Sequence, residues 1–438
     1  MTRVADSRLG PPAQVEAALN WRTAALLGLI TSTFSTLVAQ LLAARIGRDA
    51  VVDWMIVAAI PGRDGMLQAD PGWGVILGGI LFHQWADFSW AVIFFGLLGR
   101  WTGRLRPGTI LLVGLPWAVF TSASEWLFLV PVLPFWQPVF TLNQAYWIGL
   151  LVHLTSASLY PLFPWLRDWM ARRPPSPRDR RFARVWGGLA VAGLCGLGVL
   201  ALLGWQGREP PHTGGKVAFD QAYMRRMAAH HAQGVELALL AAERAQAPRL
   251  RALARMMVAE QRGEVAVLDQ WWRSWFGDVL PPATDEDHAT MPGMIPAAEM
   301  AALRQAGADA FDARFVATMT SHHRGAIAMA DAAIREAGDL RLRLMSHAIR
   351  HEQRGEIELM RGTQGFAAVR AAVLNMLLPA GAAPPDGGKA LRTAELIDPG
   401  VVCGAMSLAS TEGETTPWPR DPGSSPSGPF TSGSIGIR

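Results

Sequence analysis

The stretch Phe219-Asp220-Gln221-Ala222-Tyr223-Met224-Arg225-Arg226-Met227-Ala228-Ala229-His230-His231 decides the fold, because the chain carries a second version of it. In that version Phe311-Asp312 leads through Met319-Thr320-Ser321 to His322-His323. The same offset carries Glu260-Gln261-Arg262-Gly263-Glu264 onto Glu352-Gln353-Arg354-Gly355-Glu356. Because one offset without a gap relates both motifs, the sequence predicts that a whole helix pair has been duplicated.

Start and stop signals around these motifs predict four long helices. Pro248 suits the first turn of a helix, Gly338 ends one, and Asp339 can cap the next. The predicted helices span 217–246, 248–276, 308–337 and 339 to about 362–365. An apolar patch at 367–378 is long enough for a fifth, short helix.

Each predicted helix has one apolar face that is interrupted by a few polar residues. In the second helix Gln261 and Glu264 continue an apolar stripe at spacings of three and four, which places them on the core side. Adjacent helical residues diverge by about 100°, so one histidine of each pair can point fully inward. The residues predicted to reach the core are Gln261, Glu264, Gln353 and Glu356, together with at least one histidine from each of the pairs His230–His231 and His322–His323.

Buried imidazoles and carboxylates need partners, because an unpaired polar group in apolar surroundings costs several kcal/mol. Two explanations meet this demand. Histidines and glutamates from facing helices could bind a metal ion, as they do in other helix bundles. Alternatively, they could hydrogen-bond to one another and fix the pairing of the helices without an ion.

Methionines favour a soft metal ion. Met227 and Met319 lie on core faces, where methionine is usually a gap-filling residue. Met291 and Met294 belong to a Met-Pro-Gly-Met turn and have little packing reason to be there. Thioethers select ions such as Cu(I), and imidazole also suits Cu(II) and Zn(II).

A further histidine pair lies outside the repeated design. His347 and His351 are four residues apart and could chelate a metal. The first copy has Arg255 and Ala259 at these positions, so we expect the two histidines to be a surface pair.

The double Phe-Asp…Met-x-x-His-His…Glu-Gln-x-x-Glu pattern, with Met-Pro-Gly-Met between its copies, resembles the DUF305 family of ferritin-like four-helix proteins over about residues 215–365. Members of that family are typically exported or membrane-anchored in bacteria, and several are associated with copper binding or resistance. The first copy has Ala232-Gln233-Gly234 where the second has Arg324-Gly325-Ala326, so the two hairpins need not bind equivalently. The resemblance implies a metal site at His230, His231, His322, His323, Met227, Met319, Met291 and Met294.

The chain before residue 206 is organised by long apolar blocks. Each is long enough to cross a bilayer, which takes about 20 residues. Tryptophans recur at the block ends, as interfacial aromatic residues do. The predicted crossings are 21–44, 73–98, 109–130, 142–165 and 185–205.

Arginines predict the orientation of these crossings. They gather in the loops after the second and fourth blocks, and the loop after the third block has no charge. The positive-inside rule then places the N-terminus and both arginine-rich loops in the cytoplasm. Five crossings leave everything after residue 206 outside the bacterial inner membrane.

Four ionisable residues lie inside the predicted crossings: His83, Asp87, Glu125 and His153. Such residues usually face partners or a water-filled cavity, because they are costly in lipid. One interpretation is a small site for a metal ion, a proton or a quinone-like ligand. The other is a polar network that holds the helices together.

Composition excludes several other classes of protein. The two cysteines, Cys195 and Cys403, offer no CxxC motif and no plausible pair, so neither a disulfide framework nor a thiolate metal site is expected. The net charge of +4 comes with arginines in short loops rather than in a basic patch, so we expect no nucleic-acid partner. With 50% hydrophobic residues, the expected surroundings are membrane lipid.

The sequence therefore predicts an all-α protein. Its expected parts are a cytoplasmic N-terminus (1–20), a five-helix transmembrane region (21–205), a linker (206–216), a duplicated-hairpin, ferritin-like four-helix bundle (217–365) and a mostly disordered tail (366–438). The leading function is extracytoplasmic metal binding, most simply of copper as Cu(I) or Cu(II), for sequestration, handover to a metal-handling partner protein, or resistance. Zinc and iron fit less well.

Two alternatives remain open at this stage. The membrane region could make the protein a metal transporter or sensor. A ferritin-like dimetal oxidase normally uses Glu-x-x-His on facing helices, whereas this chain has Gln-x-x-Glu, so the sequence does not favour an enzyme.

Overall fold

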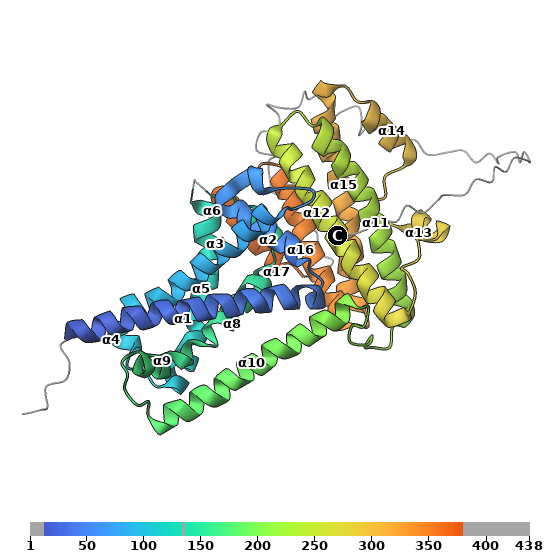
Figure 1. Cartoon of the computed structure of the whole chain (residues 1–438). Helices are drawn as coiled ribbons and strands as arrows, with labels where there is room; N and C mark the ends of the chain where they lie inside the picture. Colours follow the sequence, from blue (N-terminus) through green and yellow to red (C-terminus); the bar gives the residue numbers. More distant parts are fainter. Residues whose placement is uncertain (1–12, 134–135, 380–438) are drawn as a thin grey trace, which may run out of the picture. The chain divides into compact units, whose positions relative to one another are not determined.

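The computed structural model describes residues 13–133 and 136–379, and every element in these ranges is a helix (Figure 1). Most of the tail predicted to be disordered, from residue 380 on, lies outside the described residues, as do residues 1–12. We call residues 13–205 the membrane region. The bundle consists of α11 (Val217–Arg244), α12 (Pro248–Phe276), α15 (Ala308–Glu336) and α16 (Leu340–Met360).

Four helical segments among the described residues are long and apolar enough to cross a membrane: Gln14–Ile46, Trp73–Leu97, Pro107–Val132 and Pro177–Trp205. They contain α1 (Ala13–Leu42), α3 (Trp73–Val92), α5 (Pro107–Ser124) and α10 (Pro177–Trp205). Large apolar side chains such as Leu81, Leu112 and Val191 are exposed on these helices, as lipid-facing residues would be.

The predicted crossing at 142–165 differs from this expectation. Its residues form α7 (Val139–Asn143), α8 (Tyr146–Ala157), η5 (Tyr160–Leu162) and α9 (Phe163–Met170) instead of one continuous helix. Gln144 and Ala145 adopt extended backbone conformations, and Pro161 and Pro164 remove backbone donors further on. Hydropathy alone could not detect these interruptions.

The predicted first loop contains a helix that hydropathy also missed. α2 (Ala50–Gly62) follows the short η1 (Ala43–Ile46) and precedes η2 (Arg63–Met66). With 13 residues α2 is too short to cross a bilayer, but most of its side chains are buried.

Two helices of the membrane region end in π-helical turns. η3 (Ile93–Leu97) continues α3, and α4 (Gly99–Thr102) follows it. η4 (Glu125–Leu129) continues α5 and leads into α6 (Val130–Val132). Turns of this kind are frequent at functional sites, and Glu125 is the first residue of η4.

The bundle helices agree with the predicted boundaries to within a few residues. α11 pairs with α12 and α15 with α16, and the two hairpins meet through α11 with α15 and α12 with α16. Two short helices, α13 (Asp285–Thr290) and α14 (Ala297–Gln305), lie in the connection between the hairpins. The predicted fifth helix is α17 (Gly365–Leu377), which packs against α16 and α7.

The aspartate of each Phe-Asp motif hydrogen-bonds the turn of the other hairpin. Asp220 on α11 accepts hydrogen bonds from the backbone N–H groups of Gly338 and Asp339 at 2.8 and 2.9 Å. Asp312 on α15 accepts from the N–H groups of Gln246 and Ala247, both at 2.8 Å. Each aspartate therefore satisfies backbone donors at the start of a helix in the other hairpin.

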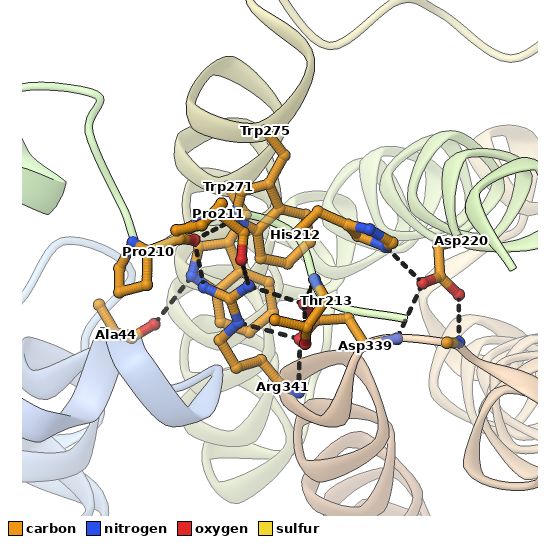
Figure 2. A network of polar contacts seen from close by, with 11 residues as sticks. Ala44, Pro210, Pro211, His212, Thr213, Asp220, Trp271, Trp275, Asp339 and Arg341 are labelled. Atoms are coloured by element: carbon orange, nitrogen blue, oxygen red, sulfur yellow. Dashed lines mark hydrogen bonds and ion pairs between the residues drawn. The ribbon is translucent and has the colours of Figure 1, made fainter. Parts of the chain in front are cut away.

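A polar network fastens the linker to the bundle (Figure 2). Asp339 accepts from the Thr213 N–H at 2.8 Å and forms an ion pair with Arg341 at 2.7 Å. The Arg341 guanidinium lies over the Trp275 ring and donates to the Pro210 carbonyl at 2.7 Å. The end of α12 and the start of α16 are thus fixed to residues 210–213.

The membrane region and the bundle share one hydrophobic cluster. Met55 and Trp126 from the membrane region belong to it together with Leu253, Met257 and Phe311 from the bundle. The apolar stripes of α12 and α15 thus pack partly against helices that lie far away in the sequence.

Candidate metal centre

The centre of the bundle holds two stacked histidine rings. His230 on α11 and His322 on α15 have ring centroids 3.8 Å apart and an interplanar angle of 18°. Both side chains are buried. The helix pair α11–α15 brings them together because the two residues occupy equivalent positions of the two motifs.

The second histidine of each pair faces a glutamate. His231 Nε2 lies 2.7 Å from Glu264 Oε2, and His323 Nε2 lies 2.8 Å from Glu356 Oε2. All four side chains are at most 4% exposed. Histidine and glutamate from each hairpin reach the interior as predicted, but both members of each histidine pair are buried, whereas the sequence predicted only one of each pair to point fully inward.

The Met-Pro-Gly-Met turn lies against the stacked histidines. His230 Nε2 is 3.2 Å from the Pro292 carbonyl oxygen, and His322 Nδ1 is 3.1 Å from that of Gly293. Carbonyl oxygens only accept, so each of these ring nitrogens carries the proton. The other nitrogen of each ring is then free to act as a metal ligand.

The Met-Pro-Gly-Met turn packs against a position at which the two copies differ, Gln233 in the first and Gly325 in the second. The Gln233 side chain donates to the Ile295 carbonyl at 2.9 Å and accepts from its N–H at 2.7 Å. At the equivalent position Gly325 has no side chain, and a Cβ there would collide with the Pro292 carbonyl. The first copy therefore hydrogen-bonds the turn through Gln233, and the second leaves space for its backbone at Gly325.

Burial keeps the stacked rings neutral. Burial, with the neighbouring rings of His323 and His231, lowers the pKa of His322 to about 3. Burial and the ring of His322 lower the pKa of His230 well below its usual value. Both rings are uncharged at pH 7, which is the form that binds metal ions.

Polar atoms without hydrogen bonds gather at this site. Buried polar groups in proteins are nearly always bonded, so such a group indicates room for an ion or ordered water. Gly234 allows the Gln261 amide and the His322 ring to approach α11 closely. Within the described residues, the atoms without a hydrogen-bond partner include His230 Nδ1, His322 Nε2, both polar side-chain atoms of Gln261 and Glu264 Oε1.

Met227, Met291 and Met319 are buried and Met294 is half-buried, but the four do not form one cluster with the histidines. Met227 and Met291 belong to the same hydrophobic cluster, and Met294 packs against it. Met319 belongs to the other cluster, which the bundle shares with the membrane region. Among the described residues, no group of three or more His, Cys, Asp or Glu side chains is arranged to hold a metal ion.

The sequence analysis missed the first glutamate of each Glu-Gln motif. Glu352 lies 2.5 Å from Arg48 Nη1, and Glu260 accepts a hydrogen bond from Asn143 Nδ2 at 2.6 Å. Burial raises the pKa of Glu260 well above the usual value. The available signal was that both copies have a glutamate at this position of the motif.

The glycines of the same motifs allow residues of the membrane region to pack closely against α12 and α16. A Cβ on Gly263 would lie 2.8 Å from Asp49 Cβ, and one on Gly355 would collide with the Leu142 carbonyl. Each Glu-Gln-x-Gly-Glu motif thus turns its first glutamate and its glycine toward the membrane region. It turns its last glutamate toward a histidine.

The prediction that His347 and His351 form a surface pair is wrong for His351. That ring is 2% exposed and lies 6.0 Å from the Trp126 ring, and burial lowers its pKa to about 3. His347 is half-buried and accepts a hydrogen bond from Trp147 at 3.3 Å. The membrane region covers this side of α16, which the bundle sequence alone could not indicate.

The ionisable residues of the membrane region form two groups. Ser35 lies 2.6 Å from Asp87 Oδ2 and 3.2 Å from His83 Nε2. Glu125 lies 3.2 Å from His153 Nε2, and His153 Nδ1 lies 2.9 Å from the Thr121 hydroxyl. The four predicted residues are thus paired two by two.

Comparison with known proteins identifies part of the chain. Residues 220–364 match the family model described as "Domain of unknown function (DUF305)". No curated protein matches the chain.

Solved structures of DUF305 proteins resemble about a third of the chain. A DUF305 protein from Streptomyces coelicolor is 27% identical over 33% of this chain and 89% of its own, with a TM-score of 0.31. A DUF305 fragment from Deinococcus radiodurans is 29% identical over 35% of this chain and 97% of its own, with a TM-score of 0.31. CopM in its Cu(I)-bound form is 25% identical over 33% of this chain and 93% of its own, with a TM-score of 0.29. Residues 220–364, about a third of the chain, are thus similar to the DUF305 family.

Proposed function

We propose that this protein is a membrane-anchored, extracytoplasmic copper-binding protein that sequesters copper or hands it over. The observation that supports this most directly is the arrangement of His230 and His322. Each of the two neutral imidazoles directs one nitrogen to a backbone carbonyl, and its other nitrogen has no hydrogen-bond partner among the described residues. A histidine–glutamate pair lies next to each of the two rings. This donor set suits Cu(II) and, with the thioethers of the adjoining turn, Cu(I).

The ligands we assign are His230 and His322, with the pairs His231–Glu264 and His323–Glu356 beside them. Met291 and Met294 flank the two carbonyls that hold the rings, so a small movement of the turn would offer a thioether to the same ion. Met227 and Met319 are further candidates on the same helix faces. Bound copper would supply an acceptor for the lone pairs that the apo site leaves without partners.

The internal duplication is part of this proposal. Asp220 and Asp312, Glu264 and Glu356, and the stacked rings all make matching contacts at equivalent positions of the two copies. A ferritin-like bundle built from two copies of one hairpin would place such a site on the pseudo-twofold axis between α11 and α15.

The membrane region supports the anchoring. Glu16 pairs with Arg173 at 3.5 Å, and Asn20 bonds the Gly99 carbonyl at 3.4 Å, so the start of α1 lies beside the arginine-rich loops. The bundle instead contacts the opposite end, through Arg48 and Asn143. With arginines inside, the bundle lies on the outer side of the bacterial inner membrane.

Metal titration of the full-length protein tests the copper proposal. We expect Cu(I) and Cu(II) to bind with dissociation constants below micromolar. The double variant H230A/H322A should weaken binding by roughly 10–100-fold or more, because loss of a residue that only supports a metal ligand already has an effect of that size. M291L/M294L should weaken Cu(I) more than Cu(II). His347→Ala on α16 is the control and should bind as the wild type does. Binding no tighter than micromolar by any ion, or equal loss in the control, would overturn the proposal.

A transporter or sensor is the second candidate, and the Arg48–Glu352 contact favours it because it joins the two parts. The test measures copper tolerance in cells. If Asp87→Asn and Glu125→Gln change nothing while His230→Ala lowers tolerance, the membrane region serves as an anchor. If all three lower tolerance at equal protein levels, the membrane region takes part in transport or signalling.

A further inference from the structure

The membrane region encloses a cavity of about 290 Å³. Its wall comes from α1, α2, α3, η4 and α8 and is mostly apolar and aromatic, with Trp54, Phe82, Trp90, Trp136 and Ile148 among the lining residues. One water occupies about 30 Å³, so the space far exceeds that of a bare ion. It lies at the lower end of the range of about 300–1,000 Å³ that is typical of sites for organic ligands.

Polar groups reach this cavity from several sides. Glu125 accepts from the Trp90 indole and faces His153, and all three line the cavity. His83 lines it from α3, where the ring hydrogen-bonds to the Ser35 hydroxyl, which in turn donates to Asp87. An apolar chamber with a few fixed polar groups is the usual form of a ligand site.

Gln144 gives the independent indication of a ligand. It lies in the extended break between α7 and α8, lines the cavity and is 6% exposed. Its side-chain amide has no hydrogen-bond partner among the described residues, although its own backbone carbonyl accepts from Trp126 at 3.2 Å. An amide that lines a cavity without a protein partner is free to donate to and accept from a ligand in that space.

The cavity has an aromatic rim toward the lipid. Trp85 lines it and is nevertheless 57% exposed, on the surface of α3 that carries the exposed Leu77 and Leu81. A ligand dissolved in the bilayer could therefore enter sideways without passing through water.

We propose that this cavity binds the head group of a lipid-soluble quinone or quinol. A flat ring fits between the tryptophan faces, and its two oxygens fit the polar groups. The Gln144 amide donates to a quinone carbonyl, and Glu125 and the amide oxygen accept from a quinol hydroxyl. A bare metal ion fits less well, because the space of about 290 Å³ is far larger than one ion and its wall is mostly apolar. The inference is independent of copper binding in the bundle.

The test measures binding of decylubiquinone to the detergent-solubilised full-length protein by isothermal titration calorimetry. Decylbenzene, which has the same chain and a ring without oxygens, is the control ligand. We expect saturable one-to-one binding of decylubiquinone, at least about tenfold tighter than decylbenzene, as loss of one or more hydrogen bonds implies.

Two variants and one control locate the site. Gln144→Leu removes the unpartnered amide, and the isosteric Glu125→Gln keeps the shape of the wall; each should weaken binding about tenfold. Gln14→Leu is the control: it is the same glutamine-to-leucine change at an exposed position of α1, and this variant should bind decylubiquinone as the wild type does. Equal affinity for the two ligands indicates a space filled by lipid chains and overturns the proposal. Wild-type affinity in both Gln144→Leu and Glu125→Gln also overturns it.

Discussion

Arg48 and Glu352 form a buried ion pair that joins the membrane region to the bundle. Their side chains are 4% and 1% exposed, and Arg48 Nη1 lies 2.5 Å from Glu352 Oε2. Arg48 also pairs at 2.8 Å with Asp53, which lines the membrane cavity. One guanidinium thus lies between the cavity wall and the carboxylates around the candidate metal centre.

Removing Arg48 should destabilise the protein strongly. Arg48→Met leaves the carboxylate of Glu352 buried without its cation, which typically costs about 3–5 kcal/mol. The measurement is thermal unfolding of the purified full-length protein. The double variant R48M/E352Q removes the uncompensated charge and should recover much of the loss. Additive losses in the double variant would show that the two side chains are not coupled.

Gly325→Ala should loosen the Met-Pro-Gly-Met turn from the histidines. The new Cβ would collide with the Pro292 carbonyl, and overpacking of this kind costs about 1–3 kcal/mol. We expect the bundle to stay folded and copper affinity to fall. Titration of the variant with Cu(I) is the measurement. Gly187→Ala on α10 is the control, because a Cβ there meets nothing within 4 Å; an unchanged affinity in Gly325→Ala would contradict the role of the turn.

The two capping aspartates should differ in importance. Asp220 is fully buried and bonds His212 at 2.8 Å besides two backbone N–H groups, whereas Asp312 is half-buried. Asp220→Ala leaves buried donors unpaired and should cost roughly 2–4 kcal/mol. Asp312→Ala should cost about 1 kcal/mol, as loss of an exposed cap does. Chemical denaturation of both variants provides the comparison, and equal losses would mean that burial does not separate the two caps.

Local signals predicted the bundle well. Pro248 and Asp339 begin helices where the sequence indicated, and the stripe that contains Gln261 and Glu264 is buried. These features depend on neighbours within a few residues, so a sequence pattern carries them. The stacking of His230 on His322 is consistent with the same pattern, because both lie at equivalent positions of the repeated motif.

Long-range contacts account for what the sequence did not reveal. Glu352 and His351 are buried because Arg48 and Trp126, some 300 and 225 residues earlier in the chain, cover them. The extended backbone at Gln144 interrupts an apolar block without changing its hydropathy. In each of these cases the position of the residue in the fold, and not its type, determined its burial or backbone conformation.

Asp339 should make the protein sensitive to acid. Burial opposes ionisation of this carboxyl, but hydrogen bonds from Arg341 and the Thr213 N–H outweigh it and lower the pKa of Asp339 to about 2 (Figure 2). In the unfolded chain an aspartate has a pKa of about 3.9, so the folded state holds fewer protons between these values. The stabilisation is therefore complete above about pH 4 and is lost as the pH falls through about 2.

Asp339→Asn isolates this contribution. The shift of almost two pKa units corresponds to about 2 kcal/mol at pH 7, so the variant should be less stable than the wild type by about that amount there. The two proteins should converge in stability as the pH approaches 2, because the wild-type carboxyl is then protonated as well. Thermal unfolding from pH 7 down to pH 2 measures the difference. Asp278→Asn, at an exposed position after α12, should show no such convergence. A difference between Asp339→Asn and wild type that stays constant with pH would mean that the ion pair with Arg341 contributes nothing to the acid sensitivity.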